Sequence, residues 1–349
     1  MLALFLLFHD DVISLTRSGP GSCGGRDERQ FFTGDTNFAG EASLLHYDLA
    51  PIYANWVRMA GETQLPPEAG DIAGSVGDYA PLTVGRRDGG HTNWASGFVT
   101  MAYFVWHLHA DTAVIERNLV RLERYIDFNE RIYNASGGLQ NFGGGCIAGW
   151  ITIGKTPSCA SMTGFGYVND YRLMAEMTAA IGAPSASRYA ALFKARLAEF
   201  HSAFFHPNSS TYGDGTQAEL AMALWLGAPP STAIETAVAA NLAAEIKAMI
   251  SATVNLTSSD PAQINFVGGV GLVYLFEALA KTGHSDTALQ LALKTSYPSY
   301  GYMFRACTTG CCVCVCVCVC PRWNAQRCSR SAFGLTFFCV LHLMMMTRK

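Results

Sequence analysis

The sequence predicts an all-α fold arranged as an (α/α) barrel, and three observations lead to this class. Apolar residues recur at helical spacing from about residue 41 to residue 295, and strand-like alternation is rare. The pattern contains about nine or ten helices joined by long and short loops, which is too many for a four-helix bundle. No fixed sequence period is visible, so the alternative of an α-solenoid is less favoured.

The helices can be located from their apolar stripes. The first stripe contains Leu45, Leu49, Ile52, Trp56 and Met59, at alternating steps of four and three residues. Later stripes are Ile115-Leu119-Leu122-Ile126, Tyr171-Met174-Met177-Ile181 and Tyr189-Phe193-Leu197-Phe200-Phe204, and further helices are expected over residues 94–109, 216–227, 231–250, 267–281 and 285–295. The connectors are rich in Gly, Pro and Ser. This order of helices and loops predicts consecutive helical hairpins.

Composition restricts the class of partner. The 349 residues carry a net charge of −3, and only 15% of them are charged while 50% are hydrophobic. This balance is typical of a large, well-buried fold and argues against nucleic acid as the main partner. The apolar run from Met1 to Phe8 lacks a basic flank and is far shorter than the roughly 20 residues that cross a bilayer. We therefore expect neither a signal peptide nor a membrane partner, and the sequence assigns no compartment.

The tail after Ala306 is a different kind of sequence. Nine of the twelve cysteines lie between Cys307 and Cys339, and those from Cys312 to Cys320 alternate strictly with valine. Zinc-binding cysteines usually form a C-x₂-C pair on a turn, whereas strict alternation would place the thiols along one face of a strand. Because a translated dinucleotide repeat encodes such a run, our hypothesis is that residues 307–349 are an aberrant tail from intron read-through or a frameshift. Transcript sequencing across the Thr309 codon tests this hypothesis, and an uninterrupted exon there would contradict it.

The densest polar cluster runs from Arg26 to Asp35 and reads RDERQFFTGD. Taken alone, a charged run of this kind is most often a solvated surface with salt bridges. However, Asp35 follows Glu28 by seven residues, and the aromatic pair between them could stack on a sugar. Glycoside hydrolysis needs a protonated carboxyl to assist the leaving oxygen and a second carboxylate to activate water or to attack. A carboxyl beside aromatic rings and another acid can have the raised pKa that an acid catalyst requires.

At these residues the chain resembles the R-D-E-R-x-x-W-T-G-D signature that opens the catalytic barrel of α-L-rhamnosidases of the glycoside hydrolase 78 type. Further matches follow in the family's order across most of the chain. They are Trp94-Ala95-Ser96, the Gly-rich loop around Trp150, the helix start at Gln217, the segment Phe266-Val267-Gly268-Gly269 and the run Tyr297-Pro298-Ser299-Tyr300-Gly301-Tyr302-Met303. Their order and number carry more weight than any single match.

The resemblance implies an (α/α)6 barrel of the six-hairpin glycosidase type over residues 22–306, preceded by a non-matching segment, 1–21, and incomplete at its C-terminal end. It implies inverting hydrolysis of terminal α-L-rhamnosyl residues from glycosides or polysaccharides. No sequence feature requires a metal or organic cofactor, because no loop of spaced Asp residues is present. Glu28 matches the family's general acid. The implied substrate-binding residues are Arg26, Asp27, Phe32, Asp35, Trp94, Trp150, Tyr300 and Tyr302, with Phe32 in place of the signature Trp. For Trp94 and Trp150 the alternative is packing in the core.

Three departures from the family's pattern bear on activity. The family's Asp six residues before the acid is Ser22 here, and the Asp of its Trp-Gly/Ala-Asp stretch is Ser96. The family's general base is a Glu shortly after an Ala-Thr-Thr segment, but this chain has no Asp or Glu after Asp286. Because the attacking water then lacks a base, we expect little or no hydrolysis by this chain. The alternatives are a catalytically inactive carbohydrate-binding homologue or another (α/α)6 barrel glycosidase.

Overall fold

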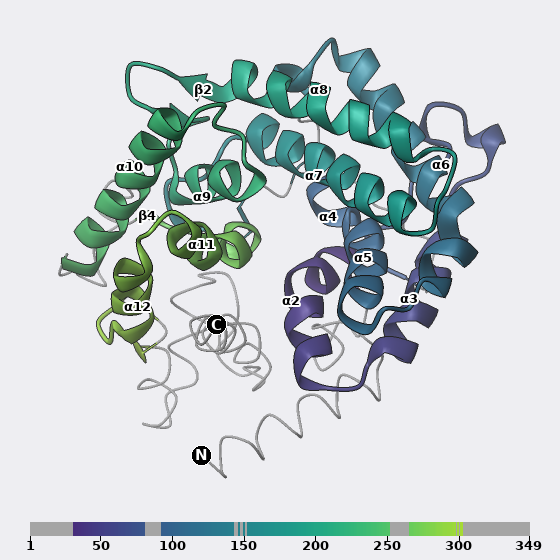
Figure 1. Cartoon of the computed structure of the whole chain (residues 1–349), viewed down its shortest axis with the longest axis horizontal. Helices are drawn as coiled ribbons and strands as arrows, with labels where there is room; N and C mark the ends of the chain where they lie inside the picture. The colour runs from purple at the N-terminus through teal and green to yellow at the C-terminus, as the bar shows by residue number, and fades with distance from the viewer. Residues whose placement is uncertain are drawn as a thin grey trace, which may run out of the picture. The chain divides into compact units, whose positions relative to one another are not determined.

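The computed structural model describes residues 31–80, 92–142, 146, 149–150, 152–251, 265–297, 299 and 301–302. Within these residues the chain is largely helical, and its strands are four two-residue segments (Figure 1). This confirms the predicted all-α class. None of the described helices has the length and apolar character of a membrane span. The described residues form two compact units, which we treat separately: unit 1 holds those up to Cys146 and residues 162–203, and unit 2 holds residues 149–161 and those from Phe204 onward.

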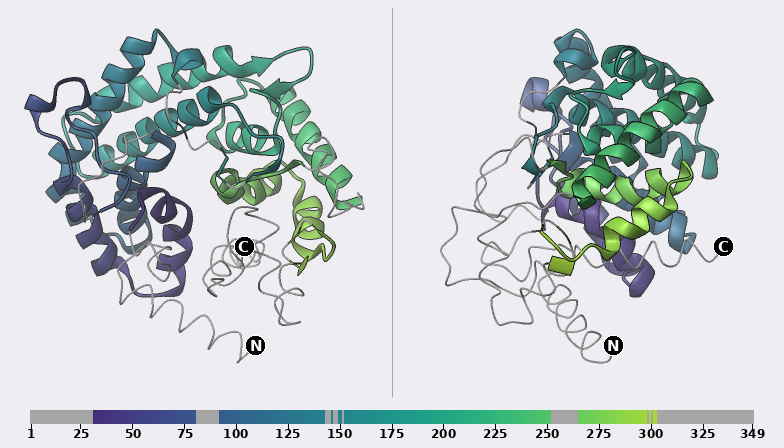
Figure 2. Two further views of the ribbon diagram at one scale, coloured as in Figure 1. Left: turned by 180° about the vertical axis from the view of Figure 1, so that it is seen from behind. Right: turned by 90° about the vertical axis from the view of Figure 1, so that its left-hand side faces the viewer.

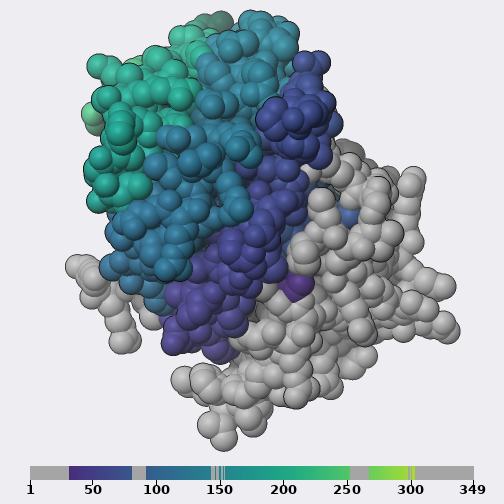
Figure 3. Space-filling view, turned by 90° about the vertical axis from the view of Figure 1, so that its right-hand side faces the viewer, coloured from purple at the N-terminus to yellow at the C-terminus, as the bar shows by residue number. Residues whose placement is uncertain are grey.

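Unit 1 contains the first helical hairpins of the chain. Its elements are α2 (Thr33–His46), α3 (Ala50–Glu62), the 3-10 helix η1 (Pro67–Ile72), α4 (Thr92–Ala95), α5 (Gly97–His109), α6 (Ala113–Ser136), the 3-10 helix η2 (Leu139–Asn141) and most of α7 (Cys159–Ala180) and α8 (Ala186–Phe204). α5 packs against α2, α3 and α6, and α3 also packs against α6. In the space-filling view the purple N-terminal helices lie directly against the blue part of this unit (Figure 3). A helix that contacts both its hairpin partner and the neighbouring hairpin is what an (α/α) barrel wall requires.

Burial in α5 and α6 follows their sequences. α6 turns a stripe that includes Ile115, Leu122 and Ile126 toward the core, as predicted, and it ends at Gly137, whose φ of 76° favours glycine. α5 is apolar on nearly all sides because it lies among α2, α3 and α6, and eight of its thirteen residues are buried. α5 is therefore the central helix of this part of unit 1.

Two of the expected helical stretches are interrupted. The prediction of one buried stripe from Leu45 to Met59 is wrong, because the chain leaves the helix between α2 and α3, so that Leu45 is exposed while Tyr53 and Trp56 form the buried face of α3. The helix expected over 94–109 is divided at Ser96, whose hydroxyl donates to the carboxyl of Asp170 on α7 at 2.8 Å.

Unit 2 contains two helical hairpins, α9 (Gln217–Leu226) with α10 (Thr232–Ser251) and α11 (Gly269–Lys281) with α12 (Ser285–Leu293). α9 packs against α10 and α11, and α12 packs against α10 and α11. Two short antiparallel pairs complete the unit: β1 (Ile153–Gly154) with β4 (Asn265–Phe266), and β2 (Phe205–His206) with β3 (Thr211–Tyr212). The four helices lie within about two residues of their predicted bounds, a range over which helix ends commonly fray.

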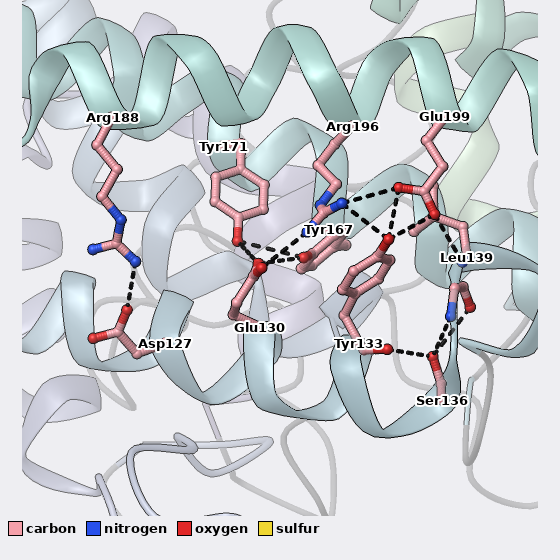
Figure 4. A network of polar contacts seen from close by, with 11 residues as sticks. Asp127, Glu130, Tyr133, Ser136, Leu139, Tyr167, Tyr171, Arg188, Arg196 and Glu199 are labelled. Atoms are coloured by element: carbon pink, nitrogen blue, oxygen red, sulfur yellow. Dashed lines mark hydrogen bonds and ion pairs between the residues drawn. The ribbon is translucent and has the colours of Figure 1, made fainter.

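A polar network joins α6, α7 and α8 in unit 1 (Figure 4). α7 and α8 lie side by side (Figures 1 and 2), and Tyr171 of α7 contacts Tyr189 of α8. The guanidinium of Arg196, on α8, donates to Glu130 of α6 at 2.9 Å. Glu130 also accepts hydrogen bonds from the hydroxyls of Tyr167 and Tyr171. One carboxylate of α6 is thus bound by groups from both helices of the next hairpin.

Glu130 is expected to make stability depend on pH in the acidic range. Burial by itself raises the pKa of Glu130, but hydrogen bonds from Tyr167 and Tyr171 and the charge of Arg196 outweigh it, so the pKa lies below its ordinary value of 4.5. A lowered pKa in the folded state stabilises the protein above the unfolded-state pKa, and this contribution is lost as the pH falls through the folded-state pKa. Glu130→Gln should therefore be less stable than wild type near neutral pH and approach it in acid. Denaturant titrations at several pH values measure the difference, and an equal loss at every pH would contradict the prediction.

Candidate active site

The signature segment enters unit 1 at the start of α2, where strand-like pairing holds its backbone. Thr33 donates its backbone N–H, at 2.8 Å, and its hydroxyl, at 2.9 Å, to the carbonyl of Asp78. The N–H of Ala80 donates to the carbonyl of Phe31 at 3.0 Å. The N-terminal end of α2 is therefore positioned by a segment 45 residues later in the chain.

Two glycines let α2 approach Trp94 and α5 closely. A Cβ atom on Gly34 would lie 2.1 Å from an indole carbon of Trp94, and one on Gly97 would lie 2.0 Å from the carbonyl oxygen of Thr33. Both distances are far below van der Waals contact, so no side chain fits at either position. The Thr-Gly-Asp part of the signature thus has a packing reason, since Gly34 seats the helix on the indole and Asp35 follows in the first turn.

Gly34→Ala is expected to destabilise the protein by about 1–3 kcal/mol, because the added methyl group must displace the indole of Trp94 or shift α2. Gly40→Ala is a matched control in the same helix, since its Cβ would meet the terminal methyl group of Met101, which can rotate away. There the better helix propensity of alanine, up to about 1 kcal/mol, offsets the contact. Thermal denaturation followed by circular dichroism compares the two variants, and similar losses would contradict the packing argument.

Two of the predicted substrate-binding residues lie at this end of α2. Asp35 is buried in the first turn, where the partial positive charge of the helix N-terminus favours a carboxylate. Phe32 directly precedes the helix, and its ring lies edge-on to the rings of Tyr79, at 5.9 Å between centroids, and Trp94, at 6.4 Å. The predictions for Ser22, Arg26, Asp27, Glu28 and Tyr300 concern residues outside the described ones.

The two candidate tryptophans differ in exposure. Trp94, in unit 1, is 3% exposed, and its indole contacts Phe32 and Phe38. Trp150, in unit 2, is 40% exposed and has a left-handed backbone, with φ of 48°. That conformation is uncommon for a bulky residue and occurs where a turn or a functional site requires it. The burial of Trp94 favours packing, whereas the ring of Trp150 has a surface on which a ligand could stack.

The backbone around Trp150 caps α11 in unit 2. The carbonyl of Trp150 accepts from the N–H of Gly269 at 2.8 Å, and that of Gly149 accepts from the N–H of Val270 at 3.3 Å. These N–H groups are among those that a helix start leaves unpaired. A Cβ atom on Gly268 would lie 1.9 Å from the carbonyl oxygen of Gly149. The close approach of the two backbones explains the glycine that precedes α11.

Tyr302, also in unit 2, follows a bend that a buried lysine stabilises. The ammonium of Lys294 donates to the carbonyls of Ser296, at 3.2 Å, and Tyr297, at 3.1 Å, and burial lowers its pKa. The ring of Tyr297 in turn lies edge-on to that of Tyr302, with 5.3 Å between the centroids. The carbonyls of Ser296 and Tyr297, which precede Tyr302 in the chain, are therefore paired with a charged side chain.

Two buried carboxylates, Glu219 and Asp170, lie outside the predicted site. Glu219, at the start of α9, accepts hydrogen bonds from three backbone N–H groups and two hydroxyls. The Thr-x-x-Glu spacing of Thr216 and Glu219 is the signal that could have found it, because that spacing marks a capping box. Asp170, in the middle of α7, accepts a hydrogen bond from Ser96 at 2.8 Å, and no sequence signal separates it from a surface aspartate. In the part of the chain that is described, no three His, Cys, Asp or Glu side chains gather as a metal site would require.

Comparison with known proteins finds one family throughout. A family model described as the six-hairpin glycosidase domain of bacterial α-L-rhamnosidase matches residues 14–312. The α-L-rhamnosidase of Streptomyces avermitilis is 26% identical over 286 residues, which are 82% of this chain and 25% of that protein. The α-L-rhamnosidase of Formosa agariphila is 23% identical over 292 residues, 81% of this chain and 29% of that protein. The chain thus spans between a quarter and a third of the length of these relatives.

The fold is also that of a solved structure. The crystal structure of the Streptomyces avermitilis α-L-rhamnosidase, complexed with L-rhamnose, matches with a TM-score of 0.73 and 20% identity, over 97% of this chain and 31% of that chain. Together with the family match, this similarity confirms the predicted six-hairpin glycosidase fold.

Proposed function

The chain belongs to the bacterial α-L-rhamnosidase six-hairpin glycosidase family, and from this premise we propose that it binds terminal α-L-rhamnosyl residues of glycosides or polysaccharides at the N-terminal end of α2. The proposal is supported chiefly by the packing of Gly34 and the position of Asp35 at that end of the helix. The family's signature runs into α2, where Gly34 rests on Trp94 and places the buried carboxylate of Asp35 in the first helical turn. A carboxylate held in this way accepts hydrogen bonds from sugar hydroxyls with little loss of conformational freedom.

Glu28 is the proposed general acid, and it donates its proton to the glycosidic oxygen as the bond to the anomeric carbon breaks. Arg26 and Asp27, on the same segment, are proposed to bind the sugar with Asp35. In an inverting reaction a second carboxylate removes a proton from the water that attacks the opposite face of the sugar. The sequence holds no Asp or Glu after Asp286, where the resemblance places that base. We therefore propose that the chain binds rhamnosides and hydrolyses them slowly.

Trp150, Tyr300 and Tyr302 are proposed as further substrate contacts. The exposed ring of Trp150 supports this role, because the C–H faces of sugars pack on aromatic rings while their hydroxyls find polar partners. The carbonyl that caps α11 restrains its backbone, so the ring is presented from a fixed turn.

Binding and turnover of the 349-residue chain test the proposal separately. Titration calorimetry should show saturable binding of L-rhamnose and none of D-glucose. An aryl α-L-rhamnoside should be hydrolysed about 10²-fold or more slowly than by a relative that has both carboxylates. Glu28→Gln should remove the remaining turnover but not the binding of L-rhamnose, whereas Glu68→Gln, on the exposed surface of η1, should change neither.

Each result distinguishes the proposal from its alternatives. If this chain hydrolyses the aryl rhamnoside nearly as fast as the relative, the proposal that it lacks a general base is wrong. If the wild-type chain binds L-rhamnose but shows no turnover, it is an inactive carbohydrate-binding homologue. Binding and hydrolysis of a different sugar would identify another (α/α)6 barrel glycosidase.

A further inference from the structure

A buried carboxyl in the middle of α7 has no role in the proposed chemistry. Asp170 is 1% exposed, its Oδ2 accepts a hydrogen bond from the hydroxyl of Ser96 at 2.8 Å, and no described residue donates to its Oδ1. Burial raises the pKa of Asp170 well above its ordinary value, because an environment without water disfavours the charged form. A buried polar group of this kind can be retained because it specifies one arrangement of its neighbours.

Asp170 is one of three residues that join a single face of α7 to α4. The hydroxyl of Thr92 donates to the carbonyl of Thr163 at 3.0 Å, and a Cβ atom on Gly166 would lie 3.0 Å from the carbonyl oxygen of Thr92. Thr163, Gly166 and Asp170 are spaced by three and four residues, so they share one face of the helix. Ser96, which binds Asp170, is the residue between α4 and α5. The carboxyl therefore ties the junction of α4 and α5 to α7.

That junction determines where Trp94 lies. Trp94 stands two residues before Ser96, and its indole is the surface on which Gly34 of α2 rests. α4 is only four residues long, so its own hydrogen bonds cannot hold it in place. The position of the indole, and with it that of Asp35 in α2, consequently depends on the contacts of α4 with its neighbours, which are α2, α5 and α7.

We propose that Asp170 is a positioning residue for the rhamnose-binding end of α2 and acts through Ser96 and Trp94. This inference takes its ligand, L-rhamnose, from the proposed function. Ser96 occupies the position at which the resembling family has an aspartate, and its hydroxyl donates to the carboxyl of Asp170 on α7.

The test uses the full chain labelled with 5-fluorotryptophan, in which the ¹⁹F resonance missing from Trp94→Phe identifies the Trp94 ring. Asp170→Ala removes the acceptor for Ser96, so the Trp94 resonance should shift or broaden. The dissociation constant for L-rhamnose should rise about tenfold or more, because a displaced binding group loses its alignment. Asp170→Asn keeps an acceptor oxygen on a side chain of the same size and should leave both readouts close to wild type.

An exchange variant sharpens the test. Asp170→Ser should resemble Asp170→Ala, and adding Ser96→Asp should restore both readouts, because the hydroxyl and the carboxyl then face each other from exchanged positions. Ser96→Asp alone places two carboxyls together in a buried site and should perturb the Trp94 resonance.

Thr178→Val is the matched control, since Thr178 is also buried on α7 but its hydroxyl donates only to carbonyls of its own helix. It should alter stability without moving the Trp94 resonance. An unchanged resonance in Asp170→Ala, an equal shift in Thr178→Val, or a shift that leaves L-rhamnose affinity unchanged would overturn the inference. If wild type does not bind L-rhamnose, the proposed function is wrong, and the resonance alone decides whether Asp170 positions Trp94.

Discussion

Arg196→Met is expected to lower the free energy of unfolding by about 3 kcal/mol or more, because it leaves two carboxylates without their counter-charge. Arg196 pairs with Glu130 at 2.9 Å and with Glu199 at 3.1 Å, and its own side chain is 17% exposed. Its Cζ also lies 3.9 Å from the centre of the Tyr133 ring, a cation–π contact that methionine cannot replace. The loss should appear in urea denaturation as a lower midpoint with an unchanged slope.

Arg188→Met provides the matched control on the same helix (Figure 4). Arg188 pairs with Asp127 of α6 at 3.0 Å, but these side chains are 51% and 48% exposed. An ion pair in that environment contributes about 0–1 kcal/mol, because water screens the charges and both side chains lose conformational freedom. If Arg196→Met and Arg188→Met lower the free energy of unfolding equally, burial does not determine how much the network contributes to stability.

Glu219→Gln is expected to cost about 2–4 kcal/mol, because both oxygens of Glu219 face only hydrogen-bond donors. Its Oε1 accepts from the N–H of Ser158 at 3.1 Å and the hydroxyl of Ser161 at 2.5 Å. Its Oε2 accepts from the N–H of Asp214 at 3.1 Å and from the N–H and hydroxyl of Thr216, at 3.1 and 2.8 Å. The amide of glutamine has only one oxygen, so its NH₂ group would meet donors on one side.

Glu235→Gln tests whether that cost comes from the paired donors. Glu235 is exposed in the first turn of α10, where its charge interacts with the helix dipole. Its replacement should change stability by less than about 1 kcal/mol. Thermal denaturation compares the two variants, and limited proteolysis should show faster cleavage near residues 155–161 in Glu219→Gln alone. Equal melting temperatures would contradict the role assigned to Glu219.

Helix positions in this protein are largely a local property of the sequence. The ranges predicted for α9, α10, α11 and α12 agree with the structure to within about two residues. Apolar spacing and helix-ending glycines such as Gly227 act over a few residues, so they can be read without knowledge of the fold. The signature around Glu28 likewise lies in contiguous residues, and its resemblance to a family implies the six-hairpin type of the barrel that the helix pattern predicts.

The tertiary structure decided which polar groups are buried and what they bind. Ser96 and Asp170 are 74 residues apart in the sequence, and Arg196 and Glu130 are 66 apart, so no local pattern could pair them. Leu45 is exposed because the chain leaves the helix between α2 and α3, and at Ser96, where the second helix is divided, the hydroxyl donates to Asp170 of α7. The sequence by itself therefore determined the hairpins and the candidate acid, through short-range periodicity and motif. Contacts between distant segments determine the exposure of Trp150, the burial of Trp94 and the burial of Asp170. Only the folded chain brings these segments together.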